Sequence, residues 1–442
     1  MIIAAYAAFC YNRRKKQRKA VRMTRLTVHG GSEDGFPMVR SALALVAVCA
    51  VATLTAAPQA TVTGLAQNGG NKVTVGYTLS GGPGIVTVDF LTNGVSIGAQ
   101  NFADVSGDVN RLVADGAHEI TWKPYSLWPG EDAENLSAQV TVWATNAPPD
   151  YLVYDFVGHA TNFYTCVEAL PDGGLANNVY KTDRIVLRRI PAKGVSWLMG
   201  SSATEVWGGT DIGAAGVSRE VTLTRDYYMA IYEITQAQYR HAGGTTTSSY
   251  SGEDADLHPV EKVASWELRG SSTSPANTSS GLRGVGGFLA TMRTRTGIAF
   301  DLPTEAEWEF ACRAGTRTSV NTGVNLVNKA SDPGMEAVAW TQDNATSTHV
   351  VGEKPANAWG LYDMHGNVSE WCADWYGPLT AGAVIDPAGP LTAQGSDRCL
   401  RGGGWAYSRS NTCRSGHRSS GGTAGAVQDR GFRVMCPVAL KW

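Results

Sequence analysis

The sequence predicts an α+β protein in which a strand-rich N-terminal region precedes a C-terminal region with little regular structure. Glycine accounts for 51 of the 442 residues and charged residues for only 17%, which favours a loop-rich, strand-rich exported protein over a helical one. Short runs of alternating apolar and polar residues recur through residues 60–146. Residues 357–372, by contrast, combine three aromatic residues with glycine and asparagine turn formers and follow neither a helical nor a strand period.

The N-terminal end of the chain carries a targeting pattern. Residues 38–60 contain a short basic segment, the apolar run Ser41 to Leu54 and a tail of small residues, which predicts a signal peptide. The apolar run is too short for a comfortable membrane span. Residues 1–37 then precede the true start, so we predict that Met38 is the initiator and that 1–37 is a non-native leader. The alternative is a basic cytoplasmic tail, with residues 41–57 as a retained anchor.

The charge of the predicted mature chain excludes some partners. Residues 1–57 hold nine of the 37 basic residues and two of the 39 acidic residues, so the remainder keeps 28 basic and 37 acidic residues and a net charge near −9. An acidic chain is a poor partner for nucleic acid or for an anionic membrane. We expect an exported protein of the periplasm, cell surface or extracellular space, with no membrane span after cleavage.

Residues 61–147 are predicted to form a β-sandwich of immunoglobulin or fibronectin type III kind. The runs are rich in β-branched residues and are separated by Gly-Gly-Pro-Gly, Asn-Gly and Pro-Gly turns. We expect this module to act as a spacer or docking module. Residues 148–184 follow as a linker, with Pro148 and Pro149, and as the entry to the next domain. The predicted strands are 72–79, 85–91, 118–122 and 139–144.

Two helices are predicted in the C-terminal region. The first runs from Thr235, a candidate N-cap, to about His241. The second begins at a capping box, in which the Thr304 hydroxyl accepts from the Glu307 amide and the Glu307 side chain returns the hydrogen bond. Trp308 and Ala311 would face the core from this helix. The glycine-rich segments 315–360 and 377–400 are predicted to be loops.

Four stretches together resemble one known family. Residues 357–372 resemble the G-L-Y-D-M-x-G-N-V-x-E-W signature of the formylglycine-generating (sulfatase-modifying-factor) family. Three more motifs occur in that family's order, at 232–239, 302–312 and 401–405 leading to 431–433. The resemblance implies that residues 185–437 form a domain with that family's α+β, C-type-lectin-like fold.

This sequence differs from active members of the family at the residues that carry the catalytic chemistry. Active members read approximately R-G-G-S-x-x-C-x-x-x-x-C, and the two thiols bind copper, since soft thiolates hold Cu(I). Counted forward from Arg401, the thiol positions are Tyr407 and Thr412, and Gly404 replaces the motif's serine. Counted back from Gly431, they fall near Trp405 and Ser410. Copper binding and oxidase activity are therefore not expected.

Cysteine usage has both a catalytic and a structural interpretation. Cys413 lies one residue from a thiol position and is the weak catalytic candidate. Six cysteines follow residue 57, and an even number in an exported chain favours disulfides. The family resemblance implies a Cys312–Cys413 bridge and, as the next candidate, Cys372–Cys399.

A structural calcium ion is the expected cofactor. The resemblance implies that Asn367, the Val368 carbonyl and Glu370 are ligands, and oxygen ligands of this kind suit calcium. The alternative is that Asn367 and Glu370 only cap turns.

We therefore predict a non-catalytic member that binds a protein or peptide ligand, with a glycan as a second possibility. Serine, glycine, tyrosine, asparagine and arginine dominate residues 404–423, a composition typical of adaptable binding loops. The alternative is a formylglycine-generating oxidoreductase acting on a cysteine of an exported sulfatase. The predicted binding surface consists of Trp405, Tyr407, Arg409, Asn411 and His417.

Overall fold

The computed structural model describes residues 57–68, 72–102, 104–124, 135–201, 205, 218–270, 287–379, 382–390 and 395–438. The predicted leader, and the predicted signal peptide except for its last four residues, lie outside these ranges. Within them, no helix is long and apolar enough to cross a membrane.

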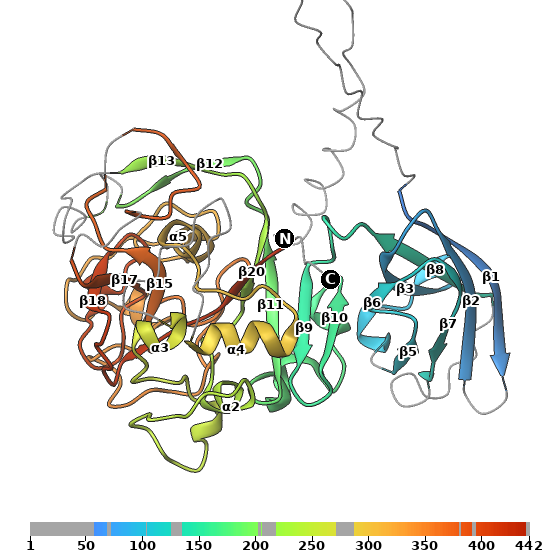
Figure 1. Ribbon diagram of the computed structural model, residues 1–442, viewed down its shortest axis with the longest axis horizontal. Helices are drawn as coiled ribbons and strands as arrows, with labels where there is room; N and C mark the ends of the chain where they lie inside the picture. Colours follow the sequence, from blue (N-terminus) through green and yellow to red (C-terminus); the bar gives the residue numbers. More distant parts are fainter. Residues whose placement is uncertain are drawn as a thin grey trace, which may run out of the picture. The chain divides into compact units, whose positions relative to one another are not determined.

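The N-terminal region is rich in antiparallel sheet, as predicted (Figure 1). The four alternating runs form the strands β2, β3, β7 and β8, and alternate residues of β2 are buried because side chains of a strand point to opposite faces. Phe90 and Trp122 stack in the core with ring centroids 4.3 Å apart. Two sheets facing one such core are consistent with a β-sandwich. The strand order in the first sheet is β1 (Gln59–Asn68), β2 (Lys72–Ser80), β7 (Gly116–Trp122) and β5 (Val105–Gly107). The strand order in the second sheet is β4 (Val95–Ser96), β3 (Gly84–Thr92) and β6 (Arg111–Val113), and β8 (Leu136–Trp143) also pairs with β3.

The main sheet of the C-terminal region has five antiparallel strands. The segment expected to be linker and entry supplies its first two strands, so residues 151–164 are part of this sheet. Strand β20, near the end of the described chain, pairs with β14. The order is β10 (Ala160–Tyr164), β9 (Tyr151–Asp155), β11 (Arg184–Ile190), β14 (Tyr227–Ala230) and β20 (Met435–Pro437).

Two smaller sheets contain the other strands described in the C-terminal region. One joins β18 (Ser419–Gly422), β17 (Asp397–Arg401), β15 (Ser369–Trp375) and β19 (Arg430–Gly431), so the residues after the signature segment lie beside the C-terminal motif. The other joins β12 (Val195–Met199), β13 (Arg219–Leu223) and β16 (Val384–Ile385).

Both predicted helices are present with their predicted N-caps. Helix α2 (Gln236–His241) follows Thr235, and α5 (Glu305–Arg313) follows the Thr304–Glu307 capping box, with hydrogen bonds of 3.2 and 2.8 Å. Trp308 and Ala311 are fully buried, as predicted.

The structure also contains short elements that the sequence did not predict. The expected loops 315–360 and 377–400 hold α6, β16 and the start of β17, because tertiary pairing orders segments too short to show a period. The unpredicted helices are α3 (Ser265–Arg269), α4 (Gly287–Thr296) and α6 (Pro333–Glu336), and the single 3-10 turns are η1 (Ala99–Phe102), η3 (Val167–Ala169), η4 (Gly174–Ala176), η5 (Asn178–Tyr180), η7 (Ala255–Leu257) and η8 (Ser410–Thr412).

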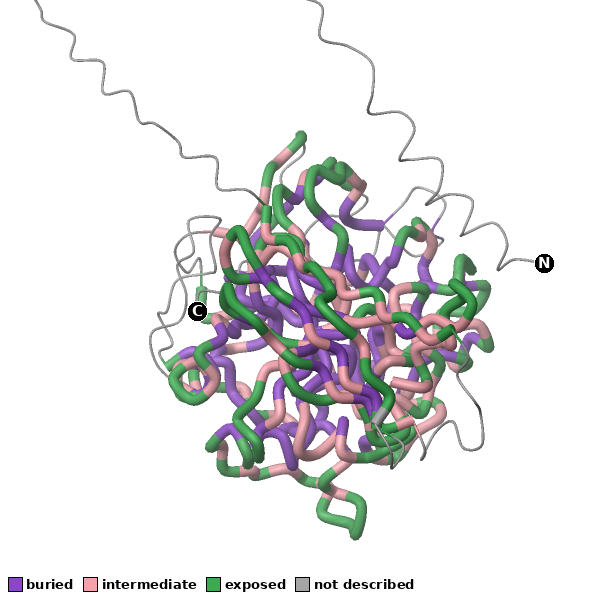
Figure 2. Tube along the Cα trace, turned by 90° about the vertical axis from the view of Figure 1, so that its right-hand side faces the viewer, coloured by how far each residue is buried: buried purple, intermediate pink, exposed green. Residues whose placement is uncertain are grey.

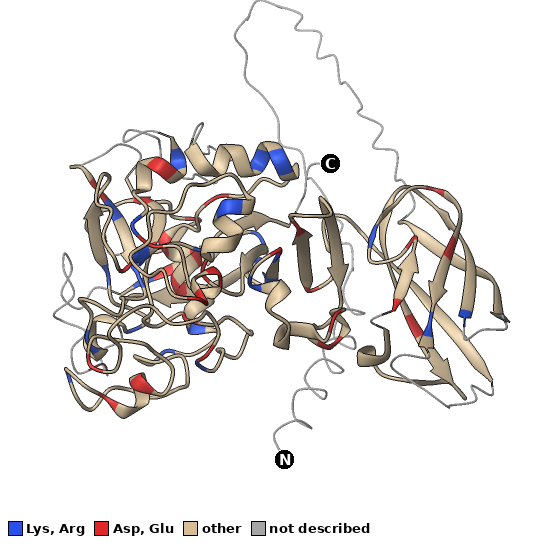
Figure 3. Ribbon diagram, turned by 90° about the horizontal axis from the view of Figure 1, so that it is seen from below, with Lys and Arg blue, Asp and Glu red and all other residues tan. Residues whose placement is uncertain are grey.

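Charged side chains are an unusual part of the C-terminal interior. Figure 2 shows buried residues running through the interior of the fold, and Figure 3 shows acidic and basic residues close together within the C-terminal region. Charges inside a protein are stable only when they are paired. Buried members that form ion pairs or hydrogen bonds include Glu233, Glu305, Glu309, Glu370, Arg313, Arg401, Arg414, Arg418 and Arg433.

Candidate functional site

Buried ion pairs fasten the C-terminal motif to α5. Glu309 of α5 contacts Arg401 at the end of β17, and Glu305 accepts hydrogen bonds of 2.6 and 2.7 Å from Arg418. These side chains are no more than 5% exposed. Burial alone would raise the pKa of Glu305, but Arg418 and Arg401 lower it to about 2. The segment between Arg401 and Arg418 is therefore held at both ends.

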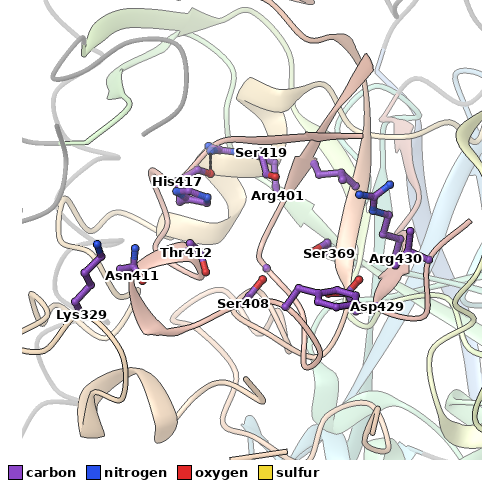
Figure 4. A pocket seen from close by; sticks show the side chains of 14 residues that line it. Lys329, Ser369, Arg401, Ser408, Asn411, Thr412, His417, Ser419, Asp429 and Arg430 are labelled. Carbon is purple, nitrogen blue, oxygen red and sulfur yellow. Dashed lines mark hydrogen bonds between the residues drawn. The ribbon is translucent and has the colours of Figure 1, made fainter. Parts of the chain in front are cut away.

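This segment supplies half of the residues that line a pocket of about 480 Å³ (Figure 4). Lys329 enters from an earlier loop, and Asp429 and Arg430 come from the segment that begins β19. Figure 4 places Lys329 and Asp429 toward opposite ends of the pocket. The lining residues are Lys329, Ser369, Leu400, Arg401, Gly403, Tyr407, Ser408, Asn411, Thr412, His417, Ser419, Val427, Asp429 and Arg430.

The pocket includes both positions at which the family resemblance expects thiols when they are counted forward from Arg401, and neither of the positions counted back from Gly431. Tyr407 is 66% exposed, and its hydroxyl lies 3.4 Å from the Gln428 amide nitrogen. The Thr412 hydroxyl both accepts from the Arg409 amide and donates to the Arg409 carbonyl, each over 2.9 Å. Neither side chain is a soft metal ligand.

Three of the five predicted binding-surface residues line this pocket, namely Tyr407, Asn411 and His417. Trp405 does not, because its indole nitrogen donates to the Gln428 carbonyl over 3.2 Å. Arg409 is exposed outside the lining. The sequence did not predict Lys329, Asp429 and Arg430 as pocket residues, because no motif or composition of their segments indicates a binding site.

Cys413 is buried beside the pocket rather than exposed in it. A Cβ atom on Gly403, which lines the pocket, would lie only 2.6 Å from the Cys413 sulfur. Burial raises the pKa of the Cys413 thiol well above its usual value. Since the thiolate is the reactive form, burial disfavours nucleophilic attack by this cysteine.

The structure differs from the predicted disulfides, because Cys312, Cys413, Cys372 and Cys399 are all thiols. The His365 ring bridges Cys312 and Cys413. Its Nε2 accepts from the Asn321 amide (3.2 Å) and lies 3.9 Å from the Cys312 sulfur, while Nδ1 donates to the Cys413 carbonyl over 2.6 Å. Burial lowers the pKa of His365 to about 4.

Cys372 and Cys399 also have separate partners. The Cys399 sulfur lies 3.4 Å from Glu305 Oε2 and 3.8 Å from the Trp375 carbonyl, while the Cys372 sulfur lies 4.0 Å from the Glu370 carbonyl. Each thiol thus serves as a weak donor in its own surroundings.

The predicted calcium ligands belong to a protein network instead. The Asn367 amide donates to Glu233 Oε2 over 2.7 Å, and the Val368 amide donates to Glu233 Oε1 over 3.0 Å. Both Glu370 oxygens accept from Arg433, at 2.6 and 2.7 Å, and one also accepts from the Trp308 indole.

A cation at Glu370 would meet the Arg433 guanidinium, so Glu370 does not fit the role of a calcium ligand. Over the described ranges, no group of three or more His, Cys, Asp or Glu residues could hold a metal ion. Glu233, which anchors the signature segment, was missed by sequence reasoning because it lies more than 130 residues away.

The fold and the pocket define the class: an α+β domain with little regular structure, whose C-terminal motif is fixed by buried ion pairs. The model of the family described as sulfatase-modifying factor enzyme 1-like domain matches residues 190–437, more than half of the chain. The chain therefore belongs to this family.

The chain is also similar to several named proteins. The chaperone protein LppX of Paenibacillus barcinonensis is 28% identical over 249 residues, which are 49% of this chain and 82% of that protein. The formylglycine-generating enzyme of Streptomyces coelicolor is 34% identical over 143 residues, which are 30% of this chain and only 45% of that enzyme. The solved structure of Treponema denticola variable protein 1 is 24% identical, with a TM-score of 0.46, and the match covers 57% of this chain and 95% of that one.

Proposed function

We propose that this chain is an exported, non-catalytic member of the family that binds a protein or peptide segment in the pocket between Lys329 and Asp429. One observation carries the proposal. The pocket contains Tyr407 and Thr412 where active members are expected to have thiols, and the nearby Cys413 is buried behind Gly403. The pocket can accommodate a ligand, but it lacks the thiol groups that copper chemistry requires.

The lining favours a peptide-like ligand. Hydroxyl and amide side chains from Ser408, Asn411 and Thr412 alternate with the exposed ring of Tyr407. Tyrosine supplies contact area at low entropic cost, and small polar side chains supply adaptable hydrogen bonds. The name of the relative LppX, a chaperone protein, supports a partner that is itself a protein.

The alternative function is formylglycine generation, and the formylglycine-generating enzymes among the relatives favour it. The two functions differ in a direct assay. The purified protein is incubated with copper, oxygen and a C-x-P-x-R peptide, with the Streptomyces coelicolor enzyme as positive control. We expect no conversion of the peptide cysteine by mass spectrometry, and Cu(I) binding no tighter than that of an unrelated protein with buried thiols. Formylglycine above background would overturn the non-catalytic proposal.

Ligand binding is tested on the pocket itself. Fluorescent short peptides from a mixed-sequence library are titrated against wild type, Tyr407→Ala and a control, Ile385→Ala. Ile385 is 69% exposed on β16 and does not line the pocket. We expect Tyr407→Ala to weaken binding by about tenfold, typical of an aromatic contact residue, and Ile385→Ala to leave it unchanged. Equal binding by all three proteins would place the ligand elsewhere.

Export and the spacer role of the N-terminal sheets belong to the same proposal. The pattern in residues 38–60 supports a cleaved signal peptide, and the strand-rich region supports an immunoglobulin- or fibronectin-like sandwich. Mass spectrometry of the protein from its native source should find the mature N-terminus near residue 58. A peptide from residues 1–37 would contradict this.

A further inference from the structure

Asp429 is a buried carboxylate in the wall of the pocket. It is 4% exposed, and it lines the pocket from the segment that leads into β19 (Figure 4). Its backbone carbonyl accepts from the Ser369 amide over 2.7 Å, which fixes the residue beside β15. The side chain is thus held in place by the sheet that supports the pocket.

Gly404 makes room for this carboxylate. A Cβ atom on Gly404 would lie 2.9 Å from both Cβ and Oδ2 of Asp429, closer than real Cβ contacts allow. The backbone of Gly404 is not in the left-handed region, so the glycine is needed for space and not for conformation. The serine that the family motif carries here would collide with Asp429. In this chain a carboxylate therefore lies against the position where the motif has a hydroxyl.

The carboxylate of Asp429 forms no ion pair within the described ranges of the chain. Arg430 is its neighbour in sequence, but the Arg430 guanidinium donates to the Gly425 carbonyl (3.3 Å) and lies over the Trp371 ring, 5.6 Å from its centroid. Burial raises the pKa of Asp429, while Arg430 and hydrogen bonds from the Tyr407 and Asp429 backbone amides only partly oppose this.

A second buried carboxyl adds to the negative field. Glu261 is fully buried, and its Oε2 has no hydrogen-bond partner. Burial raises the pKa of Glu261 and the charge of Asp429 adds to this, while hydrogen bonds from the Tyr250 and Ser249 amides and the charge of Lys262 oppose it. Taking a carboxylate out of water without a counter-ion costs free energy, which a cation from a ligand would offset.

We infer that Asp429, given room by Gly404, makes the pocket select a peptide segment that carries a lysine or arginine side chain. The inference rests on the proposed function, since it names the chemistry of the ligand for the same pocket. The basic side chain lies at the Asp429 end, away from Lys329, which would repel it. Arg430 also lines this end, but its guanidinium is held by the Gly425 carbonyl and the Trp371 ring.

The test uses short acetylated and amidated fluorescent peptides that differ only at the central residue, which is lysine, arginine, norleucine or glutamate. Their affinities for the full-length protein are measured by fluorescence polarisation. We expect lysine and arginine peptides to bind at least about tenfold more tightly than the norleucine peptide, the usual contribution of a charged hydrogen bond. The glutamate peptide should bind most weakly.

Three variants assign this preference to Asp429. Asp429→Asn should reduce the preference for lysine over norleucine to about twofold or less, while binding of the norleucine peptide persists. Gly404→Ser should do the same by displacing the carboxylate, and it leaves Asp429 itself intact. Asp256→Asn removes an exposed carboxylate, in η7 and outside the pocket, and should leave the preference unchanged. Circular dichroism checks that each variant is folded.

The outcomes separate the inference from the proposed function. If the peptides bind and Tyr407→Ala weakens them, but no basic preference exists or Asp429→Asn does not alter it, the inference is wrong and the proposed function stands. If no peptide binds, or Tyr407→Ala has no effect, the proposed function falls and the inference falls with it.

Discussion

At the residue scale, the signature segment is ordered by single buried side chains and not by regular structure. Asn367 has a positive φ of 58° and is hydrogen-bonded through its amide to Glu233 and His349. His365 connects the same segment to the region of Cys413. Each of these side chains has its own hydrogen-bond partners, so a single substitution can test its contribution separately.

The four central cysteines should behave as buried thiols. Cys312, Cys372, Cys399 and Cys413 are fully buried, and burial raises the pKa of each thiol. Alkylation of the unreduced native protein should leave them unmodified, and alkylation after unfolding without reductant should modify all four. Peptide mapping checks this. A peptide pair joined through Cys312 and Cys413 would restore the disulfide that the sequence predicted.

His365 should make stability depend on pH. Its pKa is lowered from 6.5 to about 4, so between these values the unfolded chain binds more protons and the folded state loses stability as pH falls. Relative to His365→Gln, wild type should lose on the order of 3 kcal/mol of unfolding free energy across this window. Urea unfolding at several pH values measures it, with the exposed His159→Gln as a matched control. A difference that stays constant with pH would contradict the buried neutral imidazole.

At the element scale, α5 is the helix on which the C-terminal motif depends. Its capping box fixes where it starts, its apolar residues Trp308 and Ala311 enter the core, and Glu305 and Glu309 bind the arginines that flank the pocket. A change at the start of this helix therefore acts on stability and on the pocket together.

Loss of the α5 cap should be measurable. Thr304→Ala removes the hydroxyl that accepts from the Glu307 amide and should cost about 1 kcal/mol of unfolding free energy. Thr291→Ala, an exposed position inside α4, should cost nothing, since alanine is the better helix former there. Denaturant unfolding of both variants gives the comparison. Equal effects would mean that the capping box does not hold the helix start.

At the scale of the whole molecule, stability rests on apolar cores joined by buried ion pairs, and the described residues contain no group of three or more His, Cys, Asp or Glu side chains that could hold a metal ion. Glu370 is an example, because its carboxylate is satisfied by Arg433 and the Trp308 indole.

Calcium chelation should therefore leave the melting temperature unchanged. A ligand that binds only the folded state raises its stability by mass action, so a resident ion would reveal itself as a loss on chelation. Differential scanning calorimetry with EGTA and with added calcium checks this. A drop that calcium reverses, and that Asn367→Ala abolishes, would instead support the calcium site that the family resemblance implied.

The sequence by itself determined the family, four of the strands of the N-terminal region and the starts of α2 and α5. These features depend on motifs, on period-2 alternation or on caps whose partners are only three residues apart. Such patterns are local in the sequence, so they can be recognised without the structure. It also located Tyr407 and Thr412 at the positions expected to carry thiols. Only the tertiary structure decided which partners the buried groups take. Glu233 reaches Asn367 and Asp429 lies against Gly404 across separations that no local pattern encodes, and His365 connects Cys312 to Cys413. A buried charge or thiol takes the partner that the packing brings to it, and that partner is set by the whole fold.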